Sequence, residues 1–497
     1  MNFVQNFPFF NIIMCLACGV ISSVLSAKTA RKLSIGLISI VAIMSACVLG
    51  FTLETKQSYI YMMGHFPAPW GNEIRIGVLE AAMALFFCII MLCSIVGGLE
   101  HILQDVQQQK QNLYFTMINL MLSSLLALIY TNDLFTAYVF IEINTIAACA
   151  LIMIRDNGHC LVAAMKYMIM SLIGSGLILI SISMLYDLTG HLLMSNIKQA
   201  VAEISATGEY AIPMTIIIAF LCIGLAVKSA LFPFHSWLPD AYGYATASSS
   251  AILSSLVSKG YIFLLIKIFY RVIGIEVIRD HKIDNILFVF AVSGMLIGSI
   301  CAMREHDIRR LIAYSSVAQI GYIYMGIGLG TQGAMIAALF HIMSHAATKS
   351  MLFIAAAGLS EVSGNSKDFT DLKGSGYRNK IAGAAFTVGA LSMVGIPLLA
   401  GFTSKVYFAV AAVDAEPTKM ETAMIILAIS TILNAAYFIR SIISIYTPRN
   451  TKYNNPSYRP TKTMTAALIL FIILNFFLGI GSNLIYRLIE SGISMFA

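Results

Sequence analysis

Residues 216–240 read IIIAFLCIGLAVKSALFPFHSWLPD. The stretch opens as an uninterrupted apolar run, but Lys228 then breaks it, and Pro233 and Pro239 follow closely. Proline lacks a backbone N–H and ends or kinks a helix. Broken backbone at membrane depth is tolerated only where protein or a hydrated cavity surrounds it. The stretch therefore predicts a broken transmembrane helix inside a larger membrane bundle.

The composition of the whole chain also indicates a membrane protein. The chain has 497 residues, of which 59% are hydrophobic and 11% are charged. Soluble domains contain about 25% charged residues, so this chain cannot cover a water-exposed surface of its size. The net charge of +7 is spread thinly and includes no basic run that would follow phosphates. It therefore indicates membrane orientation rather than nucleic-acid binding.

Fourteen segments have the length of about 20 apolar residues that a membrane span needs. They lie at residues 5–26, 32–52, 76–97, 112–130, 133–154, 162–187, 212–234, 244–273, 284–303, 308–328, 331–358, 380–410, 421–446 and 463–488. We therefore predict an all-α integral membrane protein of about 14 transmembrane helices, with short linkers and no large soluble domain. The first segment lacks a basic n-region and a clear cleavage site, which favours a retained span over a signal peptide.

A second span resembles the broken span at 216–240. It contains Gly395-Ile-Pro397 and then Gly401 and Lys405. Two lysine-bearing broken helices five spans apart predict two five-helix repeats, and the odd number of helices makes the repeats inverted. The predicted parts are residues 1–110 (helices 1–3), 111–275 (first repeat, helices 4–8), 276–447 (second repeat, helices 9–13) and 448–497 (helix 14).

Loop charges predict the orientation of the chain. Alternate loops contain most of the loop lysines and arginines, among them Arg309, Arg310 and the basic residues of the 449–462 loop. Positively charged loops stay inside the cell. We therefore expect a multi-pass protein of the cell membrane with both termini outside.

Two isolated charges in the spans form the first candidate site. A charge at the bilayer centre costs at least about 2.5–3.5 kcal/mol. Glu142 is the only carboxylate in the middle of span five, and Lys228 is isolated in span seven. If they pair, weakening of the pair would let Lys228 release a proton. The alternative is a static ion pair between two helices, although such buried pairs rarely add stability.

Further titratable groups lie in spans eight and eleven. Lys259 is central in span eight, whereas Lys267 lies nearer its end and could snorkel to the surface. His341, His345 and Lys349 recur at i, i+4 and i+8, so they share one helix face. Histidine titrates near neutral pH and suits a proton shuttle. The alternative is a metal bound by the two histidines, but the glutamate of HExxH and an obvious third ligand are absent.

The remaining candidates lie near the helix breaks. Lys405 follows the break in span twelve and is the last deeply placed charge. Lys166 is either a relay member or an interfacial anchor. His235 could pass protons between the interior and an aqueous funnel, and for Asp240 we favour a role as the N-cap of span eight.

The sequence predicts no cofactor, metal site or redox centre. The nine cysteines lie mostly in apolar runs, and the CxxC spacing of Cys15 and Cys18 is expected to reflect packing. No Cys/His array suits zinc or an iron–sulfur cluster. The titratable groups instead form an ordered series on different spans, which a water-bridged proton wire needs.

Four stretches resemble one protein family. They are the Glu142 segment, Lys228 with Phe232-Pro-Phe-His-Ser-Trp-Leu-Pro-Asp-Ala241, the segment from Arg309 to Tyr322, and His345-Ala-Ala-Thr-Lys349. They are similar to the antiporter-like subunits of respiratory complex I and their relatives in Mrp cation/proton antiporters and membrane-bound hydrogenases. Chain length, fourteen spans and Lys405 look most similar to the D-type subunit of Mrp antiporters or its counterpart in hydrogenase-type complexes.

This resemblance implies fourteen helices with inverted repeats, Glu142 and Lys228 as the coupling pair, Lys259 and the stripe in span eleven as the central relay, and Lys405 as the terminal switch. We therefore expect a proton-translocating subunit of a multisubunit Na⁺/H⁺ antiporter, with other membrane subunits as partners. The alternatives are a proton-pumping subunit of a redox-driven complex and a membrane scaffold whose charges only fix helix packing.

Overall fold

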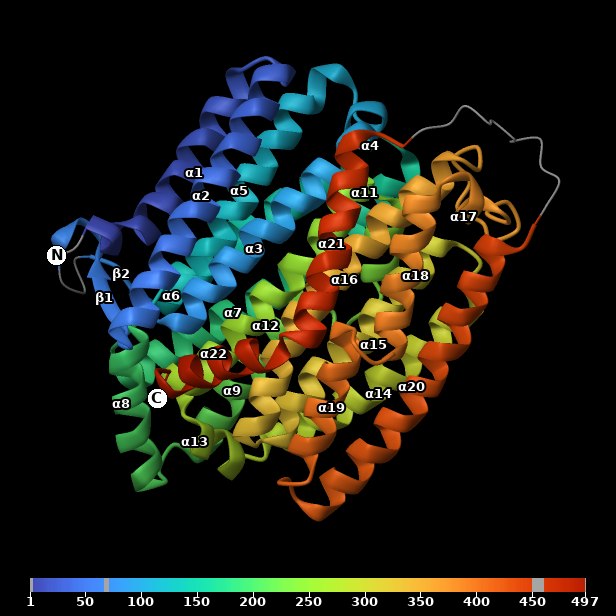
Figure 1. The fold of residues 1–497 in the computed structure, drawn as a ribbon. Helices are drawn as coiled ribbons and strands as arrows, with labels where there is room; N and C mark the ends of the chain where they lie inside the picture. Colours follow the sequence, from blue (N-terminus) through green and yellow to red (C-terminus); the bar gives the residue numbers. More distant parts are fainter. Residues whose placement is uncertain (1–2, 67–70, 449–459, 497) are drawn as a thin grey trace.

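The computed structural model describes residues 3–66, 71–448 and 460–496. Within these ranges the chain is a bundle of tilted helices with one small β-hairpin (Figure 1). The basic residues Arg449, Lys452 and Arg459, which enter the predicted orientation, lie outside the described residues.

The first part of the chain forms three long helices and the hairpin. Its elements are η1 (Phe3–Asn6), α1 (Phe7–Val24), α2 (Ala27–Thr55), β1 (Tyr59–Met62), η2 (Met63–His65), β2 (Glu73–Ile76), α3 (Val78–Gly97), α4 (Leu99–Asp105) and η3 (Gln108–Lys110). The strands β1 and β2 are antiparallel, and Tyr59 pairs with Ile76.

The middle part contains the first broken helix. Its elements are α5 (Gln111–Tyr130), α6 (Leu134–Met153), α7 (Gly158–Thr189), α8 (Met194–Thr207), α9 (Ala211–Ser229), α10 (Leu238–Tyr244), α11 (Ala247–Ile252), the π-helical η4 (Leu253–Val257), α12 (Ser258–Ile268) and the π-helical η5 (Phe269–Ile273). The segment between α9 and α10 is non-helical, as the prolines predict.

The last part contains the second broken helix. Its elements are α13 (Ile275–Asp280), α14 (Ile283–Arg304), α15 (Ile308–Leu329), α16 (Gln332–Glu361), α17 (Ser375–Arg378), α18 (Lys380–Val394), α19 (Ala400–Ala412), α20 (Pro417–Tyr446), α21 (Lys462–Ile480) and α22 (Ser482–Ser494). The break lies between α18 and α19.

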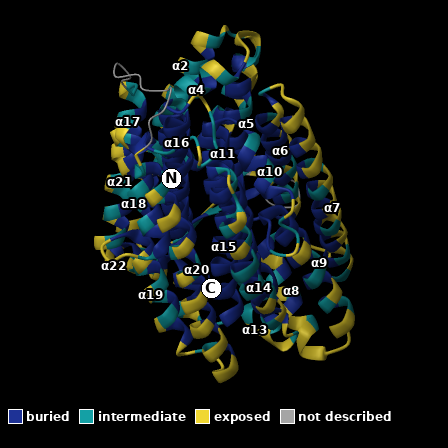
Figure 2. Cartoon of the chain, turned by 90° about the vertical axis from the view of Figure 1, so that its right-hand side faces the viewer, coloured by how far each residue is buried: buried dark blue, intermediate teal, exposed yellow. Residues whose placement is uncertain are grey.

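The predicted all-α membrane fold is confirmed. Twelve helical stretches of the described chain are long and apolar enough to span a membrane. The helix α15, which packs along α14, and the broken pair α18–α19 add two further passes, in agreement with the predicted number. The outer faces of these helices are exposed and apolar, as Ile169 and Leu172 on α7 illustrate (Figure 2). An apolar exterior is stable only against lipid or another membrane protein.

The two innermost passes lie at the centre of this bundle. In the stretch Ala247–Ile273 and in the helix α16, every residue of the most apolar 18-residue segment is buried. Both contain lysines and many small or hydroxyl side chains, such as Ser254 and Thr348. Because the other helices shield these passes from lipid, polar groups can lie on every side of them.

The position of Lys267 differs from the prediction. From its place near the end of span eight it could snorkel to the surface, but its side chain is fully buried. Its ammonium group donates to the carbonyl oxygens of Leu128, Ile129 and Thr131 at 3.0, 2.6 and 2.8 Å. These carbonyls belong to the C-terminal end of α5, where no intrahelical partner remains. Lys267 is therefore a C-terminal cap supplied by a neighbouring helix.

The loop between α16 and α18 folds onto the end of α10. The Lys367 ammonium group donates to the carbonyl oxygen of Gly243 at 2.8 Å and lies 5.7 Å from the ring centre of Tyr244. Arg309 donates to the carbonyl oxygen of Ala245 at 2.6 Å. Two cations from different segments thus cap α10. Burial, with a further contribution from Arg309, lowers the pKa of Lys367 to about 7.

We expect Lys267→Met to destabilise the folded chain. The substitution leaves three buried carbonyl groups without a donor, which costs on the order of 3 kcal/mol. Thermal unfolding in detergent should therefore begin at a clearly lower temperature than in the wild type. The exposed Lys32 provides a control, because Lys32→Met removes a lysine with no such contacts. Equal melting temperatures for the two variants would contradict the capping role.

We expect Lys367 to titrate near pH 7 in the folded protein. Its pKa in the unfolded chain is about 10.4. The unfolded state therefore binds more protons between pH 7 and pH 10, and this group makes folding more favourable as pH rises through that window. Reductive methylation of the folded protein across a pH series, read at Lys367 by mass spectrometry, should show a midpoint near 7. A midpoint near 10, as in denatured protein, would refute the prediction.

Candidate functional site

The predicted pair of Glu142 and Lys228 is present. Glu142 lies in the middle of α6, and Lys228 lies in the last turn of α9. The Lys228 ammonium group is 3.5 Å from Glu142 Oε1 and donates to Thr145 Oγ1 at 2.6 Å. The Glu142 carboxylate also accepts a hydrogen bond from Ser175 on α7. The Lys228 side chain is fully buried, whereas that of Glu142 is 27% exposed, so the pair connects the outer surface to the interior.

The break after Lys228 is closed by the chain itself. Ala230 adopts a left-handed conformation with φ of 62°, and the N–H of Leu231 donates to the carbonyl oxygen of Ala226 at 2.9 Å. The Trp237 indole donates to the carbonyl oxygen of Val227 at 3.2 Å. The free carbonyls of α9 are thus satisfied locally. The Lys228 ammonium group is left to interact with Glu142 and Thr145.

Lys259 is buried at the start of α12, directly after the π-helical segment η4. Its ammonium group donates to the carbonyl oxygen of Ser254 at 2.7 Å and to Ser258 Oγ at 3.2 Å. A π-helix shifts the backbone hydrogen-bonding pattern by one residue, and such segments often mark functional sites. Within the ion pairs of the described residues, Lys259 has no carboxylate partner.

The stripe on α16 is continuous, since α16 is an unbroken helix. The Lys349 ammonium group donates to the carbonyl oxygen of Ile312 at 2.9 Å and to the hydroxyl of Ser315. The ring centres of His341 and His345 lie 6.0 Å apart. His341 Nδ1 is 2.5 Å from Ser404 Oγ on α19. His341 Nε2 and both ring nitrogens of His345 are buried and unbonded in the part of the chain that the structure describes.

Lys405 occupies the second break. Its ammonium group donates to the carbonyl oxygens of Met393 and Val394, at 3.1 and 2.8 Å, and to Thr431 Oγ1 at 3.1 Å. The two carbonyls belong to the end of α18, so Lys405 on α19 caps the half-helix before it. Gly395 is required between them, because its φ is 95° and a Cβ there would contact the Lys405 side chain at 3.1 Å.

The candidates at the edge of the bundle do not reach this chain of groups. Lys166 is 52% exposed and pairs with Asp240 at 2.6 Å, which favours the anchor over the relay interpretation. The predicted N-cap role of Asp240 is wrong, because Thr246 caps α11 through its hydroxyl, which accepts from the N–H of Ser249. Asp240 lies one short helix earlier and also pairs with Arg310 at 2.7 Å.

His235 lies in the break between α9 and α10. Its ring centre is 5.5 Å from that of Phe232, and its Nδ1 is buried and makes no hydrogen bond to the described residues. No interaction of the described chain links it directly to Glu142 or Lys228. Its role as an entry group therefore stays a prediction.

The hydroxyl groups beside the buried lysines were not predicted from the sequence. A hydroxyl accepts a hydrogen bond from each of the four candidate relay lysines, Lys228, Lys259, Lys349 and Lys405. In chain order of the lysines, the acceptors are Thr145, Ser258, Ser315 and Thr431. Thr145 and Ser258 could have been found, since they lie close in sequence to Glu142 and Lys259. The other two belong to different helices from their lysines, and no local pattern reveals them. For a metal, in turn, no group of three His, Cys, Asp or Glu side chains comes together in the described ranges.

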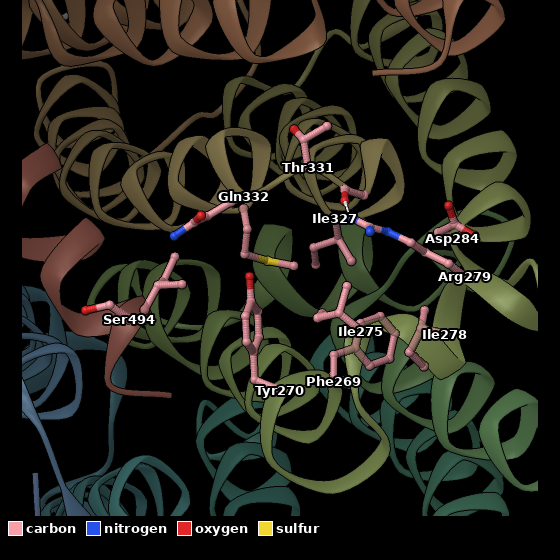
Figure 3. Close-up of a pocket in the computed structure, with 13 residues that line it drawn as sticks. Phe269, Tyr270, Ile275, Ile278, Arg279, Asp284, Ile327, Thr331, Gln332 and Ser494 are labelled. Carbon is pink, nitrogen blue, oxygen red and sulfur yellow. Dashed lines mark hydrogen bonds between the residues drawn. The ribbon is translucent and has the colours of Figure 1, made fainter. Parts of the chain in front are cut away.

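A cavity of about 260 Å³ opens near the start of α16 (Figure 3). Gln332 and Met335 of α16 line it, and Arg279 and Asp284 lie at one side. Arg279 donates to the carbonyl oxygen of Gly330 in this wall. The cavity is large enough for several water molecules. His341 lies less than two helical turns beyond Met335 on the same helix.

Comparisons with known proteins identify relatives of this chain and structures with the same fold. The N subunit of NADH-quinone oxidoreductase from Desulforudis audaxviator (strain MP104C) is 33% identical over 402 residues, which cover 81% of this chain and 78% of that protein. The D subunit of the Na(+)/H(+) antiporter from Alkalihalophilus pseudofirmus is 29% identical and is matched over 69% of this chain and 67% of its own. A chain of the Mrp complex from Dietzia sp. has the same fold, with a TM-score of 0.87 at 20% identity over 99% of this chain and 97% of that chain.

A chain of the membrane-bound sulfane sulfur reductase, an archaeal respiratory membrane complex, likewise has a TM-score of 0.87 at 23% identity, over 99% of this chain and 97% of that chain. The family described as NADH:quinone oxidoreductase/Mrp antiporter, TM, matches residues 131–446, which include both broken helices and every candidate relay group. The chain therefore belongs to this family of multi-pass membrane proteins.

Proposed function

We propose that this chain is a proton-translocating subunit of a multisubunit cation/proton antiporter. Protons move along Glu142, Lys228, Lys259, the α16 stripe of Lys349, His345 and His341, and Lys405. One observation carries the proposal. Each of the four lysines has a hydroxyl group among its hydrogen-bond partners, and the capping residue Lys267 has only carbonyl groups.

The kind of partner decides whether a lysine can change its charge. An ammonium group has three donors and no acceptor, whereas a neutral amine has a lone pair that needs a donor. A carbonyl oxygen only accepts, so three carbonyls hold Lys267 in its charged form. A hydroxyl group can accept from the ammonium form and, after rotation, donate to the amine. Lys228, Lys259, Lys349 and Lys405 are therefore solvated in both protonation states.

The Glu142–Lys228 pair can couple this relay to a neighbouring protein. Because the Glu142 side chain is partly exposed at the outer face, a charge on an adjacent subunit can compete for it. When Glu142 turns away, Lys228 loses its counter-charge and favours the neutral form. The proton then moves inward toward Lys259. This arrangement needs other membrane subunits as partners, as the Mrp name of a structural neighbour suggests.

The cavity beside α16 offers the relay a route to water. Gln332 and Met335 line it, and His341 lies less than two turns further along the same helix. By the positive-inside rule, this end of the bundle faces outside the cell membrane, because Arg155, Arg304 and Arg310 gather at the other end. Both termini are then outside. Each of the proposed inverted repeats, 111–275 and 276–447, contains one broken helix.

A second candidate is a proton-pumping subunit of a redox-driven complex. The relative with the higher sequence identity is named as a subunit of NADH-quinone oxidoreductase, and the archaeal neighbour is a respiratory complex. The relay residues would be the same in both cases. The difference lies in the source of energy, which the partner subunits supply.

We expect Lys228→Ala to lower proton flux at least tenfold in inverted vesicles that contain the assembled complex. Flux is measured with a pH-sensitive dye after addition of Na⁺. Thr145→Val should slow flux several-fold, because it keeps the volume but removes the hydroxyl that serves the neutral amine. Lys32→Ala is the control, since Lys32 is an exposed lysine of α2 outside the relay.

The same vesicles separate the candidate functions. Normal flux in Lys228→Ala would support the scaffold interpretation and refute the relay. Wild-type vesicles in which Na⁺ produces no pH change, but a respiratory donor does, would favour the redox-driven complex.

A further inference from the structure

The helix α20 has a polar face that the relay described above does not use. Figure 1 shows α20 along the outer edge of the bundle. One face is exposed and apolar, with Ile425 and Ile432. The opposite face buries Ser430, Asn434 and Tyr437, which recur at i, i+4 and i+7. Polar residues inside a membrane bundle are costly and usually functional.

The helix α15 presents a matching stripe. Ser315, Gln319 and Tyr322 also recur at i, i+4 and i+7 and are buried. The helices α15 and α20 are in contact and run in opposite directions, because two passes, α16 and the pair α18–α19, lie between them in the chain. The Tyr437 side chain interacts with Ser315, and the Tyr322 hydroxyl faces Ser430 and Asn434. The two stripes thus form one polar seam.

The seam ends at two relay lysines. At one end, Ser315 accepts a hydrogen bond from Lys349. At the other end, Thr431 of α20 accepts a hydrogen bond from Lys405 at 3.1 Å. The Lys405 ammonium group also lies 5.7 Å from the ring centre of Tyr322. Between these ends, the Tyr437 hydroxyl donates to Asn434 Oδ1 at 2.5 Å.

Several polar atoms of the seam point at one another without a direct hydrogen bond. Gln319 Nε2, Tyr322 Oη, Ser430 Oγ and Asn434 Nδ2 are buried and have no hydrogen-bond partner in the described chain. In proteins, buried polar atoms of this kind are satisfied by ordered water. The Tyr322 hydroxyl of α15 faces Ser430 and Asn434 of α20, and Gln319 lies between Ser315 and Tyr322 on the α15 stripe. Water held by them would complete the path between Ser315 and Thr431.

We propose that the seam between α15 and α20 is a second proton branch between Lys349 and Lys405, parallel to His345 and His341. The inference rests on the proposed function. Each hydroxyl or water molecule accepts a proton on one side and releases a proton on the other. The Lys349 ammonium loses one proton and the Lys405 amine gains one, so only N–H and O–H bonds change. Asn434 positions the path through its bond to Tyr437 and carries no proton.

Tyr322 separates the two branches. Its ring stacks on that of His341, with centres 5.6 Å apart and an angle of 25° between the planes. Its hydroxyl points to Ser430 and Asn434 on the other side. The histidine branch therefore contacts the face of the Tyr322 ring, the hydroxyl branch contacts its hydroxyl group, and the two branches meet at Lys405.

The test compares single and double variants in vesicles that contain the assembled complex. Parallel paths add their conductances, so the fractions of wild-type flux that remain in Tyr437→Phe and in His345→Phe should sum to about one, with a loss of about twofold in each if the branches are equal. The double variant should lower it more than twentyfold. Ser441→Ala is the matched control, since this buried hydroxyl lies one turn further on the same face of α20 and donates only to the backbone of Tyr437 at 2.7 Å. It should leave flux unchanged.

Three outcomes overturn the second branch. Wild-type flux in Tyr437→Phe, together with no added loss in the double variant, means that the seam is structural. Complete loss of flux in His345→Phe alone means that the histidines are the single path. Complete loss in Tyr437→Phe alone means that the two sets act in series. If Tyr437→Phe does not assemble on a native gel, Ser430→Ala removes one hydroxyl from the same branch and is judged by the same criteria.

Lys405→Ala distinguishes failure of this inference from failure of the proposed function. If flux is lost in Lys405→Ala but is normal in the seam variants, the relay is supported and the second branch is refuted. If flux is also normal in Lys405→Ala, the relay itself is refuted.

Discussion

The need of buried ammonium groups for acceptors determines much of this structure. In a membrane bundle, neither lipid nor bulk water can satisfy a charge or a free backbone carbonyl. A broken helix exposes carbonyls, and a buried lysine has three donors to place. Lys405 and the end of α18 meet both needs at once. Lys267 does the same for α5, and Arg309 does it for α10. The buried cations and the free carbonyls at these helix ends therefore satisfy each other.

The same constraint separates a lysine that caps a helix from the lysines that we propose as proton carriers. Lys267 donates only to carbonyl oxygens, and a carbonyl offers no donor to the lone pair of a neutral amine. Hydroxyl partners accept and donate, and they are found at Lys228, Lys259, Lys349 and Lys405. Burial alone does not make this distinction, because Lys259 and Lys267 lie only eight residues apart and both are fully buried.

The sequence predicted features that depend on local pattern. The span count, both helix breaks and the single face of His341, His345 and Lys349 follow from apolar runs, proline positions and helical periodicity. Among contacts between helices, the pair of Glu142 and Lys228 was predicted because each charge is isolated in its span, but most others were not accessible in this way. Asp240 precedes a helix and resembles a cap, but its partners Lys166 and Arg310 come from α7 and α15. The polar stripes of α15 and α20 are each visible as i, i+4, i+7 patterns, and only the structure shows that they face one another.

The structure also refines the comparison of the two broken helices. Lys228 precedes its break along the chain, whereas Lys405 follows its break. The two passes run in opposite directions through the bundle, since α9 and α16 both begin at the end where α13 lies and α18 begins at the other end (Figure 1). Lys228 and Lys405 therefore both belong to the half-helix nearer the α13 end. His341 lies beside Ser404 of α19, next to Lys405, whereas Lys349 lies eight residues further along α16 and contacts Ser315. Eight helical residues span about 12 Å along the helix axis. The proposed relay therefore changes depth along the α16 stripe, so this stripe, and not only the points where the relay meets water, contributes to movement across the membrane.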